Sequence, residues 1–285
     1  KIYSVPVNGF WESMFVNTKV LEAAGVTLPG ADYTWDAFLA DCQKIKDAGF
    51  TPVAVSLQEV PHYWFEFTVY NNGNTANHLS VPAASADETG LKWAAGLEDI
   101  KALYDAGYLP ENTLTATDAE TVQLVADGEA AFLIDGSWKI GFFQANTADH
   151  LEDFALTYVP GKGERQATDL IGGISMGYFI TRKAWDDPAK RDAAVKFVEF
   201  MTSDEQVSIF SVTAVTALKN GVIPAPTLDS LQKSAIAMCA GATSVVGAVQ
   251  DKLTSEQRGD LFANVKNIVT AKITAAEAID SALAK

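Results

Sequence analysis

Aromatic and polar side chains gather directly after three predicted strands, where a ligand could reach them. Phe10, Trp11 and Glu12 follow the first of these strands, residues 59–64 follow another, and Trp138 comes shortly after the strand AAFLI. In open α/β sheets, ligands bind beyond the carboxyl ends of the strands. Indole and phenol rings stack on the apolar faces of a pyranose, while carboxylates and amides hydrogen-bond to its hydroxyl groups. These residue types therefore fit a cleft for carbohydrate.

Each of these rings also has a simpler interpretation, which is packing in the hydrophobic core. For Trp64 and Phe10 the two interpretations are equally good, because nothing in the surrounding residues separates them. Trp138 is the best candidate for an exposed ring, because Gly136 and Ser137 let its side chain project from a tight turn.

Two enzymatic hypotheses, a glycosidase and a serine hydrolase, compete with the hypothesis of a binding protein. Glu59 and Glu66 flank the aromatic run, and a glycosidase needs an acid and a base on either side of its sugar. Spacing in sequence does not fix their distance, so this alternative stays open beside solvated or hydrogen-bonding carboxylates. The pattern GISMG at 173–177 matches a nucleophile elbow around Ser175, but a strand follows it and all three histidines precede it. The sequence therefore argues against a serine hydrolase.

Metal, cofactor and nucleic acid are not expected as partners. The histidines share no ligand spacing, and Cys42 and Cys239 lie too far apart to form a zinc signature. The GKG at 161–163 is too short for a phosphate cradle and is explained by a turn. The 36 acidic and 21 basic residues give a formal charge of -15, which repels the phosphates of nucleic acid.

The elements that would position these residues alternate between strand and helix. We predict strands at 1–7, 14–17, 51–57 and 130–134, and helices at 18–24, 34–49, 91–107 and 118–128. With 285 residues, 48% of them hydrophobic, the chain can form two lobes or one large domain. The alternation predicts a mixed α/β sheet covered by helices, and no apolar run is long enough to cross a membrane.

Several segments, taken in order, resemble the extracellular solute-binding proteins of sugar ABC importers, the family 1 group that includes maltodextrin-binding protein. The matching segments include YSVPVNGFWESMFVN, YTWDAFLADCQKIKDAGFTPVAV, LVADGEAAFLIDGSW and GGISMGYFITRKAWDDPAKRDAAVKFVEFMTSDEQ. The Thr-Trp helix, the DGEAAF-to-GSW block and the KFVEFMTSDEQ helix together make the resemblance specific. It implies a type II periplasmic-binding-protein-like fold, in which two α/β lobes clamp the ligand.

The resemblance also implies a set of binding residues. It implies that Trp138 faces the cleft and stacks on sugar, and that the loop at 57–63 supplies a carboxylate and an aromatic ring. It places the segment after the first hinge at Asn8, and the passage of the second hinge at Gly172 and Gly173. The expected ligand-binding residues are Asn8, Trp11, Glu12, Glu59, His62, Tyr63, Trp64, Trp138, Gly172 and Gly173.

Members of the family that this chain resembles carry a long part of their first lobe before the segment that matches KIYSVPV. We therefore expect the first lobe to be truncated here. Residues 1–7 would be a hinge strand of that lobe and 8–174 the second lobe. Residues 175–220 would form the hinge return with helices of the first lobe, and 221–285 would form C-terminal helices that pack mainly on the second lobe.

The expected function is that of a monomeric, non-enzymatic receptor without a cofactor. It would bind a mono- or oligosaccharide between its lobes and deliver it to the permease subunits of an ABC importer. The expected location is the extracellular face of the cytoplasmic membrane, with a lipid anchor, or the periplasm. The alternatives are a carbohydrate-active enzyme that uses Glu59 and Glu66, and a receptor for a non-sugar solute such as a polyamine or a peptide.

Overall fold

A mixed β-sheet forms the centre of the computed structural model, which describes residues 4–74, 78, 80–211, 215–218 and 228–285. Its strand order is β2-β3-β1-β5-β6, and β4 also pairs with β1. The strands are β1 (Val5–Asn17), β2 (Thr51–Val53), β3 (Ala130–Gly136), β4 (Phe154–Thr157), β5 (Asp169–Tyr178) and β6 (Ser244–Val246). β1 is antiparallel to β3, β4 and β5, whereas β2 with β3 and β5 with β6 are parallel pairs. The predicted mixed α/β sheet is therefore confirmed.

Strand β1 corrects one prediction. We expected a strand at 1–7 that ends at Pro6 and a separate one at 14–17, but Val5–Asn17 is one strand of 13 residues. Proline is tolerated because the register of the β1–β5 pairing shifts between Pro6 and Asn8, and a bulge does not need every backbone N–H. Residues 1–3 of the expected strand lie outside the described residues.

The helices begin and end largely where their capping residues indicate. They are α1 (Thr18–Ala23), α2 (Trp35–Asp47), α3 (His62–Asn72), α4 (Glu88–Asp105), α5 (Asp118–Ala126), α6 (Ile140–Asn146), α7 (Arg182–Trp185), α8 (Pro188–Met201), α9 (Asp204–Phe210), α10 (Ser230–Ala240), α11 (Ser255–Val269) and α12 (Ala275–Leu283). The Thr34 hydroxyl accepts a hydrogen bond from the Ala37 N–H, and Thr117 forms a capping box at the start of α5. None of the helices in the described part of the chain is both long and apolar enough to cross a bilayer.

Helix α3 was not predicted. We expected residues 59–64 to be a loop after a strand, but a helix begins at His62, and its residues from Tyr63 to Asn71 are all buried. A helix that is buried on every side has no polar face, so the apolar period that identifies a surface helix is missing from its sequence.

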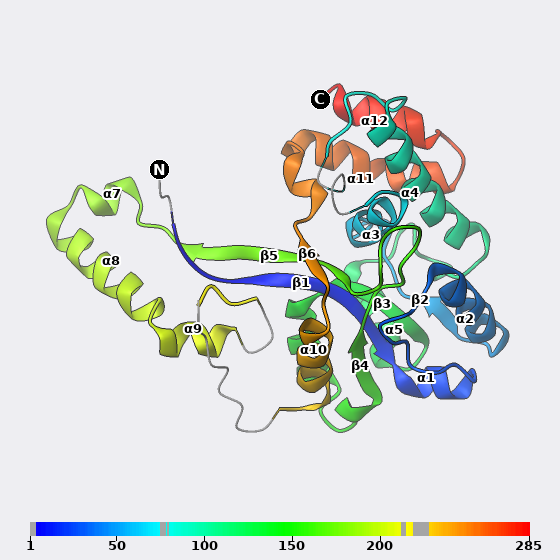
Figure 1. Ribbon diagram of the computed structural model, residues 1–285, viewed down its shortest axis with the longest axis horizontal. Coiled ribbons are helices and arrows are strands. Elements are labelled where there is room, and N and C mark those ends of the chain that lie inside the picture. The colour runs from blue at the N-terminus through cyan, green and yellow to red at the C-terminus, as the bar shows by residue number, and fades with distance from the viewer. Residues whose placement is uncertain (1–3, 75–77, 79, 212–214, 219–227) are drawn as a thin grey trace.

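Beyond the sheet, β1 and β5 continue as a two-stranded ribbon toward α7, α8 and α9, which lie apart from the other helices (Figure 1). A third segment joins this ribbon, because the Gly9 N–H donates to the Val215 carbonyl at 2.8 Å and the Ala217 N–H donates to the Val7 carbonyl at 3.0 Å. Three stretches of chain therefore connect the two groups of helices. We call them the hinge ribbon: residues 5–9, 173–178 and 215–217.

Candidate ligand-binding site

Three rings form an aromatic group on the protein surface. The Trp138 ring centroid lies 6.0 Å from that of Phe10 and 6.0 Å from that of Tyr63. Phe10 comes from β1, Tyr63 from the start of α3, and Trp138 from the 3-10 turn η1 (Ser137–Lys139) that follows β3. The Trp138 side chain is 52% exposed, whereas Tyr63 is buried and Phe10 is half-buried. We call these three rings the aromatic platform.

The end of strand β3 explains why the Trp138 ring lies there. After Gly136 the chain turns at once, and the indole folds back over the Gly136 backbone, where a Cβ atom would overlap the six-membered ring of the indole. Glycine at 136 therefore leaves the space that the ring occupies. The Phe10 and Tyr63 rings lie beside the indole, and Trp138 remains 52% exposed.

Carboxyl groups lie next to the platform. Glu12 of β1 is the register partner of Gly136, and the Asp135 Oδ1 atom accepts from the Gly136 N–H at 2.6 Å. The Lys139 ammonium lies 3.5 Å from Asp135 Oδ2 and also donates to Asp118 at the start of α5. This chain of contacts continues to the protein surface, because the Asp118 N–H donates to the exposed side chain of Glu59 at 2.7 Å.

Burial shifts the pKa values of these acids. Desolvation raises the pKa of Asp135 to about 7, although Lys139 opposes the shift. Desolvation also raises the pKa of Glu12 well above its usual range, and the nearby Glu66, Asp135 and Asp251 add to the effect. Near neutral pH, Asp135 and Glu12 therefore retain protons that exposed carboxyl groups would have lost.

Glu66 has a structural role that removes it from the enzymatic alternative. Its side chain is fully buried in α3, and its two oxygens accept from the Val249 N–H at 2.8 Å and the Gln250 N–H at 2.7 Å. The carboxylate thus joins α3 to the turn η3 (Val249–Lys252). A substrate has no access to this carboxylate, so it cannot form the acid and base pair of a glycosidase with Glu59.

The structure brings some of the expected site residues together at the platform. Tyr63 and Trp138 belong to it, and the His62 ring lies 4.1 Å from the Tyr63 ring. The exposed Glu59 is linked to it indirectly, because it accepts from the Asp118 N–H and Asp118 contacts Lys139. Desolvation lowers the pKa of His62 to about 4, so its imidazole is neutral near pH 7. Glu12 lies beneath the platform and is only 1% exposed, so the structure does not bring its side chain to the surface of the platform.

Other expected residues lie elsewhere. Trp11 and Trp64 are 3% and 2% exposed and belong to the main core, so the structure does not bring them to the surface of the platform. Trp11 points to the opposite face of the sheet from Glu12, because successive side chains of a strand alternate. Trp64 packs against Trp35 and Phe38.

Asn8 and Gly173 belong to the hinge ribbon, and Gly172 lies in β5 directly before it. The Asn8 side chain donates to the Phe210 carbonyl at the end of α9, at 2.9 Å. Gly172 is buried where β5 approaches β1 closely, because a Cβ atom there would lie 2.5 Å from the Phe10 carbonyl oxygen. Gly173 pairs with Phe10 and is half-buried, and a Cβ atom built there would meet no atom within 4 Å. Strand β5 therefore runs beside Phe10 of the platform, and these three residues do not form part of its exposed surface.

Sequence reasoning missed Asp118, Asp135 and Lys139. Asp135 stands inside the conspicuous block that ends at Trp138, so its position was available as a signal. Asp118 reaches the site only because α5 packs beside β3, and no local pattern announces that contact. No group of three or more acidic, His or Cys residues among the described residues has the geometry to hold a metal ion.

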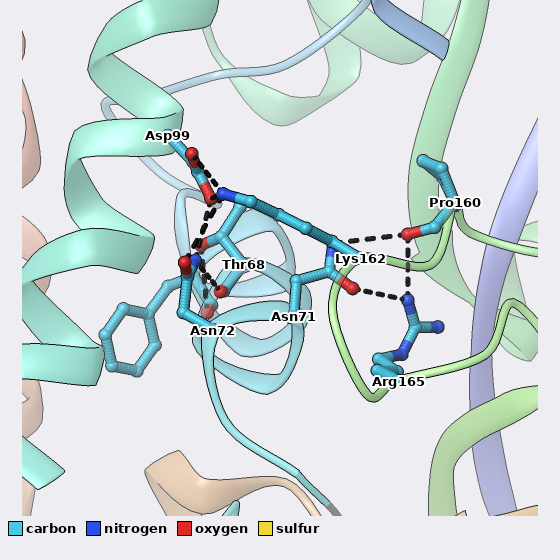
Figure 2. Close-up of polar contacts among 8 residues, drawn as sticks. Thr68, Asn71, Asn72, Asp99, Pro160, Lys162 and Arg165 are labelled. Atoms are coloured by element: carbon cyan, nitrogen blue, oxygen red, sulfur yellow. Dashed lines mark hydrogen bonds and ion pairs between the residues drawn. The ribbon is translucent and has the colours of Figure 1, made fainter. Parts of the chain in front are cut away.

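A second polar group fixes the loop that contains GKG (Figure 2). The Lys162 ammonium donates to Asp99 of α4 at 2.6 Å and to Asn72 of α3 at 3.3 Å. The buried Arg165 guanidinium donates to the Asn71 side chain at 3.0 Å and to the Pro160 carbonyl at 2.9 Å. Lys162 is therefore committed to an ion pair, in agreement with a turn rather than a phosphate site.

Comparisons with known proteins agree with this architecture. A family model described as bacterial extracellular solute-binding protein matches residues 1–208. Among solved structures, a chitin oligosaccharide binding protein superposes with a TM-score of 0.85 at 22% identity, over 100% of this chain and 71% of that chain. The GacH receptor of Streptomyces glaucescens, solved unliganded and with acarbose, gives 0.74 at 19% identity, over 100% and 70%. The raffinose complex of RafE gives 0.72 at 20% identity, over 100% and 72%.

No curated protein gives a significant match. The superpositions confirm the predicted periplasmic-binding-protein-like α/β fold, and the family description confirms the expected location outside the cytoplasm. Because the family model covers most of the chain, this protein belongs to the bacterial extracellular solute-binding proteins.

Proposed function

We propose that this chain is the substrate-binding component of an ABC importer for a mono- or oligosaccharide. The observation that carries the proposal is the aromatic platform, in which a half-exposed indole is held by two rings above hydrogen-bonding carboxylates. An apolar face with polar groups around it suits a pyranose, which has apolar faces and a rim of hydroxyl groups. The similar solved structures named above include receptors for chitin oligosaccharide, raffinose and acarbose.

In this proposal the hinge ribbon permits closure. A ligand on the platform favours a closed form only if it contacts groups on both sides of the ribbon in that form. The proposed division is therefore the one expected from the sequence, with 8–174 as the lobe that carries the platform and 175–220 as the hinge return with α7, α8 and α9. The closed monomer then presents its sugar to the permease, without a cofactor and without chemical change.

A second candidate is a receptor for a polyamine, and the carboxyl groups near the platform favour it. Cations bind to aromatic faces and to carboxylates, and both are present at this site. A sugar accounts better for the broad exposed indole face, because a thin aliphatic amine covers less of it.

The test is a thermal-shift screen against mono- and oligosaccharides and against spermidine, followed by calorimetric titration of each sugar that stabilises the protein. Trp138→Ala is expected to weaken sugar binding by about tenfold or more, because the indole loses its buried contact area. Trp185→Ala is the matched control, because Trp185 of α7 is 48% exposed and lies outside the platform. Unchanged affinity in Trp138→Ala, or stabilisation by spermidine alone, would overturn the proposal.

A further inference from the structure

The surroundings of the aromatic platform carry more negative than positive groups. The carboxyl groups are those of Glu12, Glu59, Asp118, Asp135 and Asp251. In the described part of the chain, the cation that pairs with this group is Lys139, which contacts Asp118 and Asp135. We call these five carboxyl groups the acidic group. Even with Lys139 fully charged, its charge is outnumbered.

Two oxygen atoms of the acidic group have no hydrogen-bond donor among the described residues. They are Oε2 of Glu12 and Oδ1 of Asp118, and both are buried. Acceptors in such surroundings create a negative potential that water screens poorly. The Trp138 ring lies over Gly136, next to Asp135 in the chain and opposite Glu12 in the sheet, so a ligand on the ring lies within this potential.

The acidic group also holds protons that a cation would displace. Asp135 faces Tyr63 of α3, Asp118 of α5 and Lys139 of η1, and burial raises its pKa to about 7. Glu12 faces Glu66 of α3 and Asp251 of η3 in addition to Asp135, and its pKa is raised further by these like charges. A positive charge nearby favours the ionised form of a carboxyl group, so it lowers such pKa values.

We propose that the platform selects sugars by charge, binding a unit that carries a protonated amine more tightly than the matching neutral unit and rejecting the matching unit that carries a carboxylate. This inference rests on the proposed function, because it concerns the same site. Each net negative charge about 8 Å from a charged ligand changes affinity by about tenfold in either direction at low salt.

The first experiment uses matched sugars at pH 6.5 and low ionic strength. Calorimetry compares glucose with glucosamine and glucuronate, galactose with galactosamine and galacturonate, and the β-1,4-linked trimers of glucose, glucosamine and glucuronate. In each series that binds, we expect the amine form to bind about tenfold more tightly than the neutral form, and the carboxylate form about tenfold more weakly. Both differences should shrink in 0.5 M salt, because exposed charges are then screened over a few ångströms.

A second readout detects the protons directly. Titrating the amine forms near pH 7 in buffers with different ionisation enthalpies should reveal a net release of protons, whereas the neutral forms should release none. Asp135→Asn removes one of the protons and should reduce both the release and the preference for the amine. Glu88→Gln is the control. Glu88 of α4 is 86% exposed, and this substitution removes a carboxyl group that lies away from the platform.

The outcomes separate the two proposals. Sugar binding that is equal for all three charge types, or tightest for a carboxylate, would overturn the charge selection and leave the sugar receptor intact. Failure of every neutral, amine and carboxylate sugar to bind would overturn the sugar receptor, and the charge selection with it. If Asp135→Asn does not fold, the salt dependence and the proton release of the unaltered protein still decide the result.

Discussion

The carbonyl group of Gly173 occupies the space that a side chain at Gly9 would need, across the pairing of β1 with β5. Gly9→Ala is therefore expected to separate the two strands and to lower the free energy of unfolding by about 2–3 kcal/mol. Gly173→Ala is the control, because no atom lies within 4 Å of a Cβ atom built there. Urea denaturation of both variants checks the expectation, and equal stability of the two would contradict it.

The position of the Trp138 indole depends on Gly136 in a similar way. Gly136→Ala places a methyl group where the indole lies, so the ring must rotate away. We expect sugar affinity to fall about as far as in Trp138→Ala, that is about tenfold or more, with an altered tryptophan fluorescence spectrum. Gly141→Ala on α6 meets no atom and should keep full affinity. Normal binding by Gly136→Ala would show that the indole position is unimportant.

Stability should fall as pH rises above 6.5. Burial raises the pKa of Glu66 to about 8, so the folded state holds a proton that the unfolded chain has already lost. His62 and His78 act in the opposite sense, because their pKa values are lowered to about 4, but their effect ends near pH 6.5. Between pH 6.5 and 8.5 Glu66 should therefore lower the free energy of unfolding by about 2 kcal/mol, and Asp135 and Glu12, whose pKa values burial also raises, add to the decrease.

The matched variant for this pH effect is Glu66→Gln, which keeps one oxygen to accept a backbone N–H but no longer titrates. Its free energy of unfolding should fall by about 2 kcal/mol less than that of the unaltered protein over the same pH range, as measured by urea denaturation at each pH. The decrease that remains belongs to Asp135 and Glu12. A variant that follows the unaltered protein across the range would assign the effect to other groups.

The buried Arg165 should matter more to stability than the neighbouring Lys162. Its guanidinium donates to the Asn71 side chain and to the carbonyls of Pro160 and Asp169, and it stacks on Phe67 at 4.8 Å. Arg165→Lys cannot supply the same fork of donors, so we expect the free energy of unfolding to fall by about 2–4 kcal/mol.

Lys162→Met provides the comparison, because the Lys162 and Asp99 side chains are partly exposed and form a pair that contributes about 1 kcal/mol or less. Thermal and urea denaturation of the two variants should rank them clearly. A larger loss in Lys162→Met than in Arg165→Lys would contradict the proposed order.

The parts of the fold that follow local rules were predictable. Thr34 marks the start of α2 through its side-chain hydrogen bond, and Gly25 and Gly49 adopt the positive φ angles that end α1 and α2. The exposure of Trp138 followed from the small residues before it. Each of these features depends on residues within a few positions of one another.

The parts that failed depend on contacts distant in sequence. Helix α3 is buried on all sides, so no pattern within it distinguishes it from a buried strand or loop. The Glu66 side chain accepts hydrogen bonds from backbone N–H groups 183 and 184 residues away, and its sequence neighbours give no indication of them. Trp11 and Glu12 were assigned to one surface because β1 was expected to end before them, whereas a continuous strand sends them to opposite faces.

The unbroken course of β1 has a mechanical consequence. Its first residues belong to the hinge ribbon, and Phe10 and Glu12 follow on the same strand beside and beneath the Trp138 ring. A rotation of α7, α8 and α9 about the register shift near Asn8 would therefore displace strand β1, which supports the indole. Ligand binding at the indole and rotation about the hinge would then be coupled through β1, with the hinge only two residues from Phe10.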